Sequence, residues 1–99
     1  MTLDRPNPTI LLVDDEASNL DSLERIFAKE GLDVLRAPSG KDALDIVRKR
    51  KVDVVLTDLM MPGITGVDLL KAVKQLSSET EVIVMTAFGT VENAVRAIG

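Results

Sequence analysis

Three aspartates stand where apolar stretches of the sequence end. Asp14 and Asp15 close the run "TILLVDD", and Asp58 closes "VVLTD". If both runs are strands of one sheet, the three carboxylates share an edge, and at an effective dielectric near 20 and about 5 Å each pair costs roughly 3 kcal/mol. A divalent cation offsets this repulsion, and Mg²⁺ binds through a few carboxylates while keeping water and phosphate oxygens as ligands. The pattern therefore predicts a Mg²⁺ site.

The absence of histidine and cysteine narrows the chemistry further. Without them the chain has no imidazole base, thiolate zinc site, disulfide or cysteine nucleophile. An aspartate carboxylate remains as a nucleophile that can form an acyl phosphate. Asp58 has the better position, because we expect the region of Gly63 and Gly66 after it to be open and flexible, whereas Asp14 and Asp15 lead directly into a helix.

Each of these features also has a simpler interpretation. An aspartate before a Pro-Gly turn, such as Asp58, is usually turn chemistry. Asp14 and Asp15 with the following glutamate also suit an acidic first turn of a helix. The methionines Met60, Met61 and Met85 are interpreted as packing residues rather than ligands. Only the placement of these signals on one predicted sheet edge favours a functional site.

Apolar runs and helical periodicities alternate along the chain. Strands are predicted within 9–15, 32–37, 52–58 and 81–86, and helices within 16–31, 38–51, 66–76 and 90–98. This alternation with short connections predicts a parallel sheet with helices on both faces and right-handed crossovers. Ligands of such sheets bind at the carboxyl ends of the strands, where the three aspartates and Thr86 stand.

Local signals predict helix ends and buried helix faces. Ser39 is predicted as an N-cap and Gly31 as the residue after a helix C-terminus. Helical spacing also predicts two helix faces that point into the core. The first consists of Leu20, Leu23, Ile26 and Phe27, and the second of Val67, Leu70, Val73 and Leu76 or their neighbours.

Length and composition set outer limits on function. The chain has 99 residues, 45% of them hydrophobic and 28% charged, which predicts one folded domain over 9–99 after a flexible leader at 1–8. A net charge of −4 argues against direct nucleic-acid binding. No apolar stretch approaches the roughly 18 to 20 residues of a membrane span, and no signal peptide is visible, so we expect a cytoplasmic protein.

Three stretches, "ILLVDDE", "VVLTDLMMPGITGVDLL" and "VIVMTAFGTVENAVRAI", resemble the receiver domain of bacterial two-component response regulators. The last is most similar to receivers of transcriptional activators that act at enhancers with the alternative sigma factor. The resemblance covers Thr9 to Ile98. It implies an α/β, flavodoxin-like, doubly wound parallel sheet of strand order 2-1-3-4, with a parent protein that regulates transcription.

The resemblance also implies roles for particular residues. Asp58 would be the phosphoacceptor, and Asp14 and Asp15 would bind Mg²⁺ together with Asp58 and the backbone carbonyl of Met60. Thr86 would be the switch hydroxyl that turns toward the phosphoryl group. The phosphoryl donor would be a histidine kinase acting in trans.

Receivers contain a fifth strand and fifth helix, and an essential lysine follows that strand. The given sequence stops at Gly99, and all its lysines precede Thr86. We therefore expect a C-terminally truncated receiver whose fourth strand forms an edge, which favours self-association through that strand or through helix faces.

Two functions compete with a working receiver. The first is a non-switching interaction or dimerisation fragment with a vestigial acidic site. The second is a phosphohydrolase with an aspartyl nucleophile, which typically needs another aspartate two residues later as general acid. Because Met60 occupies that position, we expect a signalling module rather than an enzyme.

Overall fold

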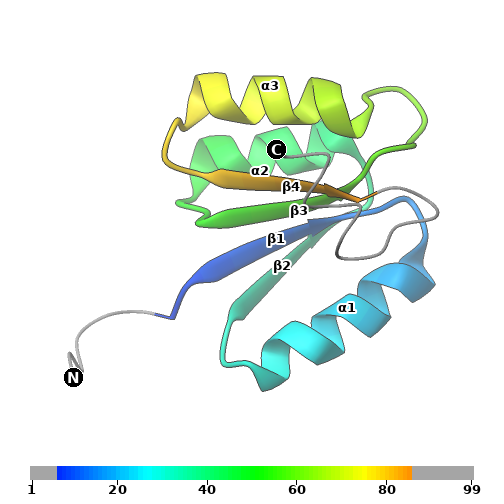
Figure 1. The fold of residues 1–99 in the computed structure, drawn as a ribbon, viewed down its shortest axis with the longest axis vertical. Coiled ribbons are helices and arrows are strands. Elements are labelled where there is room, and N and C mark those ends of the chain that lie inside the picture. Colours follow the sequence, from blue (N-terminus) through cyan, green and yellow to red (C-terminus); the bar gives the residue numbers. More distant parts are fainter. Residues whose placement is uncertain (1–6, 86–99) are drawn as a thin grey trace.

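A four-stranded parallel sheet runs through residues 7–85, the part of the chain that the computed structural model describes (Figure 1). Its strands lie in the order β2-β1-β3-β4. Their bounds are β1 Thr9–Val13, β2 Asp33–Ala37, β3 Val54–Asp58 and β4 Glu81–Met85. The predicted parallel sheet and its 2-1-3-4 order are confirmed.

Three helices connect the strands and cover the two faces of the sheet. Their bounds are α1 Ala17–Lys29, α2 Gly40–Lys49 and α3 Gly66–Leu76. In Figure 1, α1 lies on one side of the sheet, and α2 and α3 lie on the other. None of the helices in residues 7–85 is long and apolar enough to cross a bilayer. The helix predicted within 90–98, Thr86 and most of the predicted leader lie outside the described residues.

The core has two parts because successive strand residues point to opposite faces of a sheet. Leu11 and Val13 of β1 belong to the larger cluster, which is packed by α2 and α3, whereas Ile10 and Leu12 belong to a smaller cluster that includes Leu20 of α1. All four β1 side chains are at most 4% exposed. Strand β1 is thus buried on both faces, which explains its continuous apolar sequence.

The predicted helix faces were partly wrong. Ile26 of α1 is 56% exposed, because it lies about 100° around the helix from the half-buried Phe27. In α3 the fully buried side chains are those of Leu69 and Val73, while Val67 and Leu76 are 45% and 46% exposed. Val67 lies beside the buried face, and Leu76 is the last residue of the helix.

The helix ends follow the predicted chemistry and add one cap. Ser39 caps α2, since its hydroxyl oxygen accepts a hydrogen bond from the Asp42 backbone N–H at 3.2 Å. Gly31 follows the end of α1 with a φ of +81°, a left-handed conformation that glycine adopts readily. Thr65, which was not predicted, caps α3 through the Asp68 N–H at 3.2 Å.

Candidate functional site

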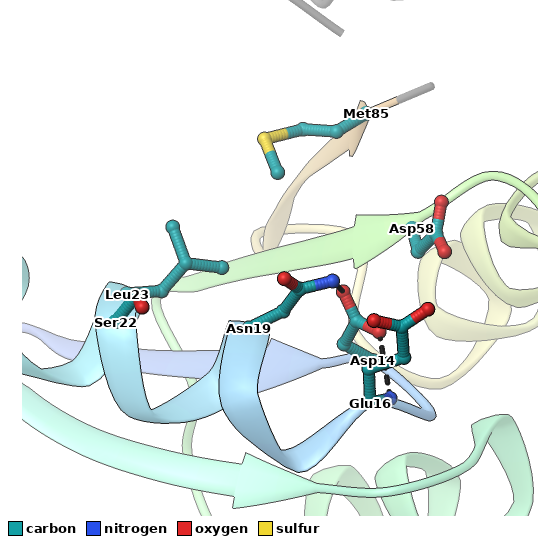
Figure 2. A pocket seen from close by; sticks show the side chains of 7 residues that line it. All are labelled: Asp14, Glu16, Asn19, Ser22, Leu23, Asp58 and Met85. Carbon is teal, nitrogen blue, oxygen red and sulfur yellow. Dashed lines mark hydrogen bonds between the residues drawn. The ribbon is translucent and has the colours of Figure 1, made fainter. Parts of the chain in front are cut away.

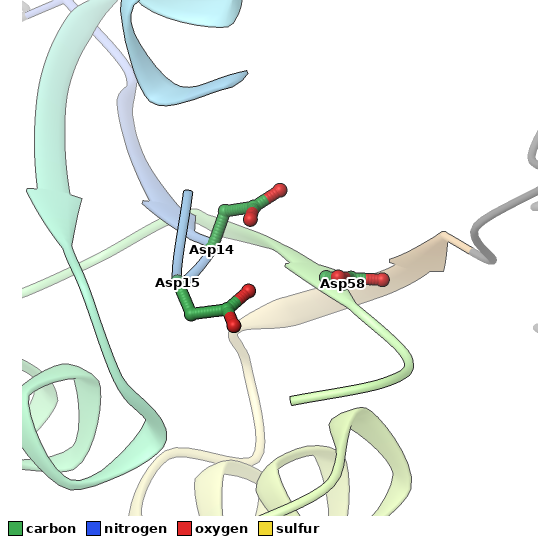
Figure 3. Close-up of side chains that lie close together, drawn as sticks. All are labelled: Asp14, Asp15 and Asp58. Atoms are coloured by element: carbon green, nitrogen blue, oxygen red, sulfur yellow. The ribbon is translucent and has the colours of Figure 1, made fainter. Parts of the chain in front are cut away.

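The three predicted carboxylates meet at the carboxyl edge of the sheet (Figure 3). Strands β1 and β3 are neighbours in the sheet, with Val13 opposite Thr57, so the chain brings the next residues, Asp14 and Asp58, close together. Asp15 follows on the loop to α1. One carboxylate oxygen from each of the three aspartates lies within 4.8 Å of the other two. The convergence predicted from the strand ends is therefore present.

Asp14 is the most rigidly held of the three. It is only 5% exposed, and each of its carboxylate oxygens accepts one hydrogen bond (Figure 2). The Glu16 backbone N–H donates to Oδ1 at 2.9 Å, and the Asn19 side-chain amide donates to Oδ2 at 3.2 Å. Asn19 was not predicted as a site residue. Its only signal in the sequence is a polar side chain at the start of the helix that follows the aspartates.

Asp58 is half-buried at the end of β3, and its Oδ1 accepts a hydrogen bond from the Met60 backbone N–H at 3.3 Å. Burial raises the pKa of the Asp58 carboxyl above its ordinary value, and the charges of Asp14 and Asp15 raise it further. The hydrogen bond from Met60 acts in the opposite direction. Loss of hydration thus raises this pKa more than the charge of either neighbouring aspartate does.

Backbone hydrogen bonds and close packing fix the loop after Asp58 against the end of β4 and the start of α3. The Leu59 N–H donates to the Met85 carbonyl at 2.6 Å, and the Gly66 N–H donates to the Leu59 carbonyl at 2.9 Å. A Cβ on Gly66 would lie 2.6 Å from the Asp58 carbonyl oxygen. The expectation of an open region at Gly66 was wrong, because the start of α3 packs directly against the end of β3. Gly63, with a φ of +81° and open space around it, does lie in an open turn.

The methionines near the site differ in environment. Met61 is 7% exposed and packs in the larger core cluster, as predicted. Met60 is 67% exposed, so the prediction that it packs in the interior was wrong. Its side chain lies toward solvent, whereas its neighbours Leu59 and Met61 pack in or against the larger core cluster. Met85 contacts the smaller core cluster and also borders the site.

A hollow beside the carboxylates leaves room for a ligand (Figure 2). Its volume is about 460 Å³, and the residues that line it come from the β1–α1 loop, α1 and the ends of β3 and β4: Asp14, Glu16, Asn19, Ser22, Leu23, Asp58 and Met85. Thr86, the predicted switch residue, lies outside the described residues.

The donor set suits Mg²⁺. The three converging groups are all carboxylates, and Mg²⁺ prefers hard oxygen ligands that leave part of its coordination to water or phosphate. Asp15 is exposed and Asp58 is half-buried, so the centre of the trio is reachable from solvent. The residues present therefore fit the metal that the resemblance implies.

Fold and site together define a flavodoxin-like α/β domain with an acidic, metal-compatible centre at the carboxyl ends of its strands. Comparison with known proteins places it more narrowly. The family described as the response regulator receiver domain matches residues 10–99. The chain belongs to this family, whose members serve as receiver domains of two-component response regulators.

Named relatives are consistent with this assignment. The chain is 41% identical over 86 residues to sporulation initiation phosphotransferase F of Bacillus subtilis, covering 87% of this chain and 69% of the relative. It is 40% identical over 92 residues to the transcriptional regulatory protein ZraR of Escherichia coli O157:H7, covering 93% of this chain and 21% of ZraR. The predicted similarity to receivers of transcriptional activators is confirmed, and the chain spans about one fifth of such a regulator.

A solved structure agrees at the level of the fold. The response regulator protein TrrA from Thermotoga maritima, in complex with Mg²⁺-BeF, superposes with a TM-score of 0.77 at 30% sequence identity, over 81% of this chain and 70% of TrrA. The flavodoxin-like arrangement of this chain is thus shared with a receiver that holds Mg²⁺.

Proposed function

We propose that Asp58 accepts a phosphoryl group from a histidine kinase while Asp14, Asp15, Asp58 and the backbone carbonyl of Met60 hold Mg²⁺. The convergence of the three carboxylate groups within 4.8 Å carries this proposal. The membership of the chain in the receiver family supports it. The Mg²⁺ in the TrrA structure supports the choice of metal.

The chemistry requires one nucleophile and a way to tolerate negative charge. A carboxylate oxygen of Asp58 attacks the phosphorus of the kinase phosphohistidine, the P–N bond breaks, and the leaving imidazole takes a proton from solvent. Bound Mg²⁺ supplies neutralisation of the charge on the phosphoryl oxygens. The Met60 N–H orients the Asp58 carboxylate, and the two hydrogen bonds to Asp14 fix the neighbouring carboxylate.

The remaining roles follow the same assignment. Thr86 is proposed as the switch hydroxyl, at the residue directly after β4. The module acts in signalling rather than as an enzyme, and the longer protein regulates transcription, a proposal supported by the relative ZraR. The net charge of −4 supports the proposal that this chain does not itself bind nucleic acid.

Labelling by a small phosphodonor tests the acceptor directly. With acetyl phosphate and Mg²⁺, the wild-type chain should gain one phosphoryl group by mass spectrometry, and Asp58→Asn should gain none. Asp53→Asn is a matched control, because it removes one carboxylate directly before the opposite end of β3 and should be labelled like the wild type. Equal labelling of wild type and Asp58→Asn, or none in either, would exclude Asp58 as the acceptor.

A second candidate function is a non-switching interaction fragment. Within residues 7–85, β4 pairs only with β3, and an edge strand favours pairing with another chain. On this proposal the chain self-associates through β4 or the helix faces, and the acidic site is vestigial. Sedimentation that shows only monomer at high micromolar concentration would exclude it, and labelling of Asp58 would show that the site is not vestigial.

A further inference from the structure

We propose that Asn19 is a positioning residue that sets the metal affinity of the site by holding the Asp14 carboxylate. The inference rests on the proposed function of the acidic trio as a Mg²⁺ site. It goes beyond that function because Asn19 lies on α1, outside the three carboxylates, and acts through one of them.

The contact has only one chemically possible orientation. The Asn19 amide approaches Asp14 Oδ2 at 3.2 Å (Figure 2), and because an ionised carboxylate only accepts hydrogen bonds, the amide nitrogen must face it. The other oxygen of Asp14 is already engaged by the Glu16 N–H. With one donor on each oxygen, the carboxylate cannot rotate without losing a hydrogen bond.

The other two carboxylates are less constrained. Within residues 7–85, the Asp58 carboxylate accepts one hydrogen bond, from the Met60 N–H at 3.3 Å, and no hydrogen-bond donor reaches the Asp15 carboxylate. Asp14 is therefore the fixed reference point around which the two others adjust. A donor that orients a metal ligand typically changes metal affinity by about 10- to 100-fold.

The chemical type of Asn19 matters as much as its position. A neutral amide orients Asp14 without removing negative charge from the trio, whereas a lysine or arginine at the same place would compete with the cation. Asn19 is exposed while the next residue, Leu20, is buried in the smaller core cluster. Changes at Asn19 can therefore alter the site while leaving the packing of α1 intact.

The test measures Mg²⁺ binding itself. Asn19→Leu removes the amide with little change in size, and Ser18→Leu adds the same apolar side chain at the preceding exposed position as a control. Isothermal titration with Mg²⁺ alone should give a Kd about tenfold higher for Asn19→Leu than for wild type, and an unchanged Kd for Ser18→Leu. Asn19→Ala should reproduce the loss without adding apolar surface.

A purely structural role predicts a different result. Urea unfolding without Mg²⁺ should give similar midpoints for wild type and the Asn19 variants, whereas a structural role would lower the midpoint and leave the Kd unchanged. Equal Kd values for wild type and both Asn19 variants would overturn the inference about Asn19 alone. A wild-type chain that binds no Mg²⁺ would instead overturn the proposed function, and with it this inference.

Discussion

At the residue scale, Asp58 is under two opposing influences. Half-burial favours the neutral carboxyl and raises its pKa, yet attack on phosphorus needs the carboxylate. The Met60 N–H stabilises the charged form. The negative charges of Asp14 and Asp15 disfavour the ionised form of Asp58. Without metal, this repulsion lowers the stability of the folded state, and a bound cation would relieve it.

This cost predicts that Asp58→Asn stabilises the metal-free fold. Without Mg²⁺ and near neutral pH, we expect the free energy of unfolding to rise by about 1 to 3 kcal/mol. The folded-state pKa of Asp58 lies above its unfolded value, so the folded state binds more protons and wild-type stability falls as pH rises through that folded-state pKa. The gain from Asp58→Asn should therefore shrink as pH is lowered through the same range. Urea titrations at several pH values measure it.

Asp53→Asn serves as the control for this prediction. Asp53 lies directly before β3, at the end of the strand opposite the trio, and accepts a hydrogen bond from the Thr9 backbone N–H at 2.7 Å. Loss of its charge should weaken that hydrogen bond and lower stability. A lowered urea midpoint for Asp58→Asn at neutral pH would contradict the idea that burial and repulsion strain this carboxylate.

At the scale of elements, the junction between β3 and α3 positions Asp58. Helix α3 begins at Gly66, whose N–H binds the Leu59 carbonyl and whose missing side chain lets the helix approach the Asp58 backbone. The Thr65 cap fixes the same helix end. The position of the proposed nucleophile thus depends on how closely this helix packs against the strand.

Gly66→Ala should disturb this junction. The added Cβ would lie 2.6 Å from the Asp58 carbonyl oxygen and 2.9 Å from the Leu59 Cα, and because these are backbone atoms, the strand end or the helix must move. We expect a loss of about 1 to 3 kcal/mol in unfolding free energy, together with slower labelling of Asp58 by acetyl phosphate.

Gly31→Ala is a control that separates loss of stability from slower labelling of Asp58. Gly31 follows the C-terminal end of α1, far from the β3–α3 junction, and has a φ of +81° with open space around it. Alanine there costs stability through its backbone conformation, about 1 kcal/mol. Its labelling rate should match that of the wild type. Wild-type labelling by Gly66→Ala would show that the junction does not position Asp58.

The order of the elements could be predicted from the sequence because each strand is a short apolar run and each helix has a period near 3.6. The meeting of Asp14, Asp15 and Asp58 followed, since parallel strands end at one edge. The role of Gly66 and the contact of Asn19 could not be predicted in this way. Both depend on atom positions across elements. The local sequence around the glycine is typical of a flexible turn, and a lone asparagine carries no periodic signal.

At the scale of the whole molecule, metal binding and folding are linked. A ligand that binds only the folded state stabilises it, by about 2.7 kcal/mol when its concentration is a hundred times the Kd. We expect Mg²⁺ to raise the urea midpoint of the wild type, because the trio forms only when β1 and β3 pair. The rise should be smaller in Asp15→Asn, which removes one ligand on an exposed loop. An equal rise in both would show that Mg²⁺ acts elsewhere.

The unequal division of the core has a consequence for local opening. Among residues 7–85, twelve buried residues form the cluster under α2 and α3, whereas four form the cluster on the α1 side, and α1 itself contributes one buried side chain. Segments with little buried apolar contact open at lower free energy. Amide hydrogen exchange should therefore be faster in α1 than in α3. Because α1 carries Asn19, Mg²⁺ should slow exchange most in the first turn of this helix. The exchange rate of these amides would then show whether the site holds Mg²⁺.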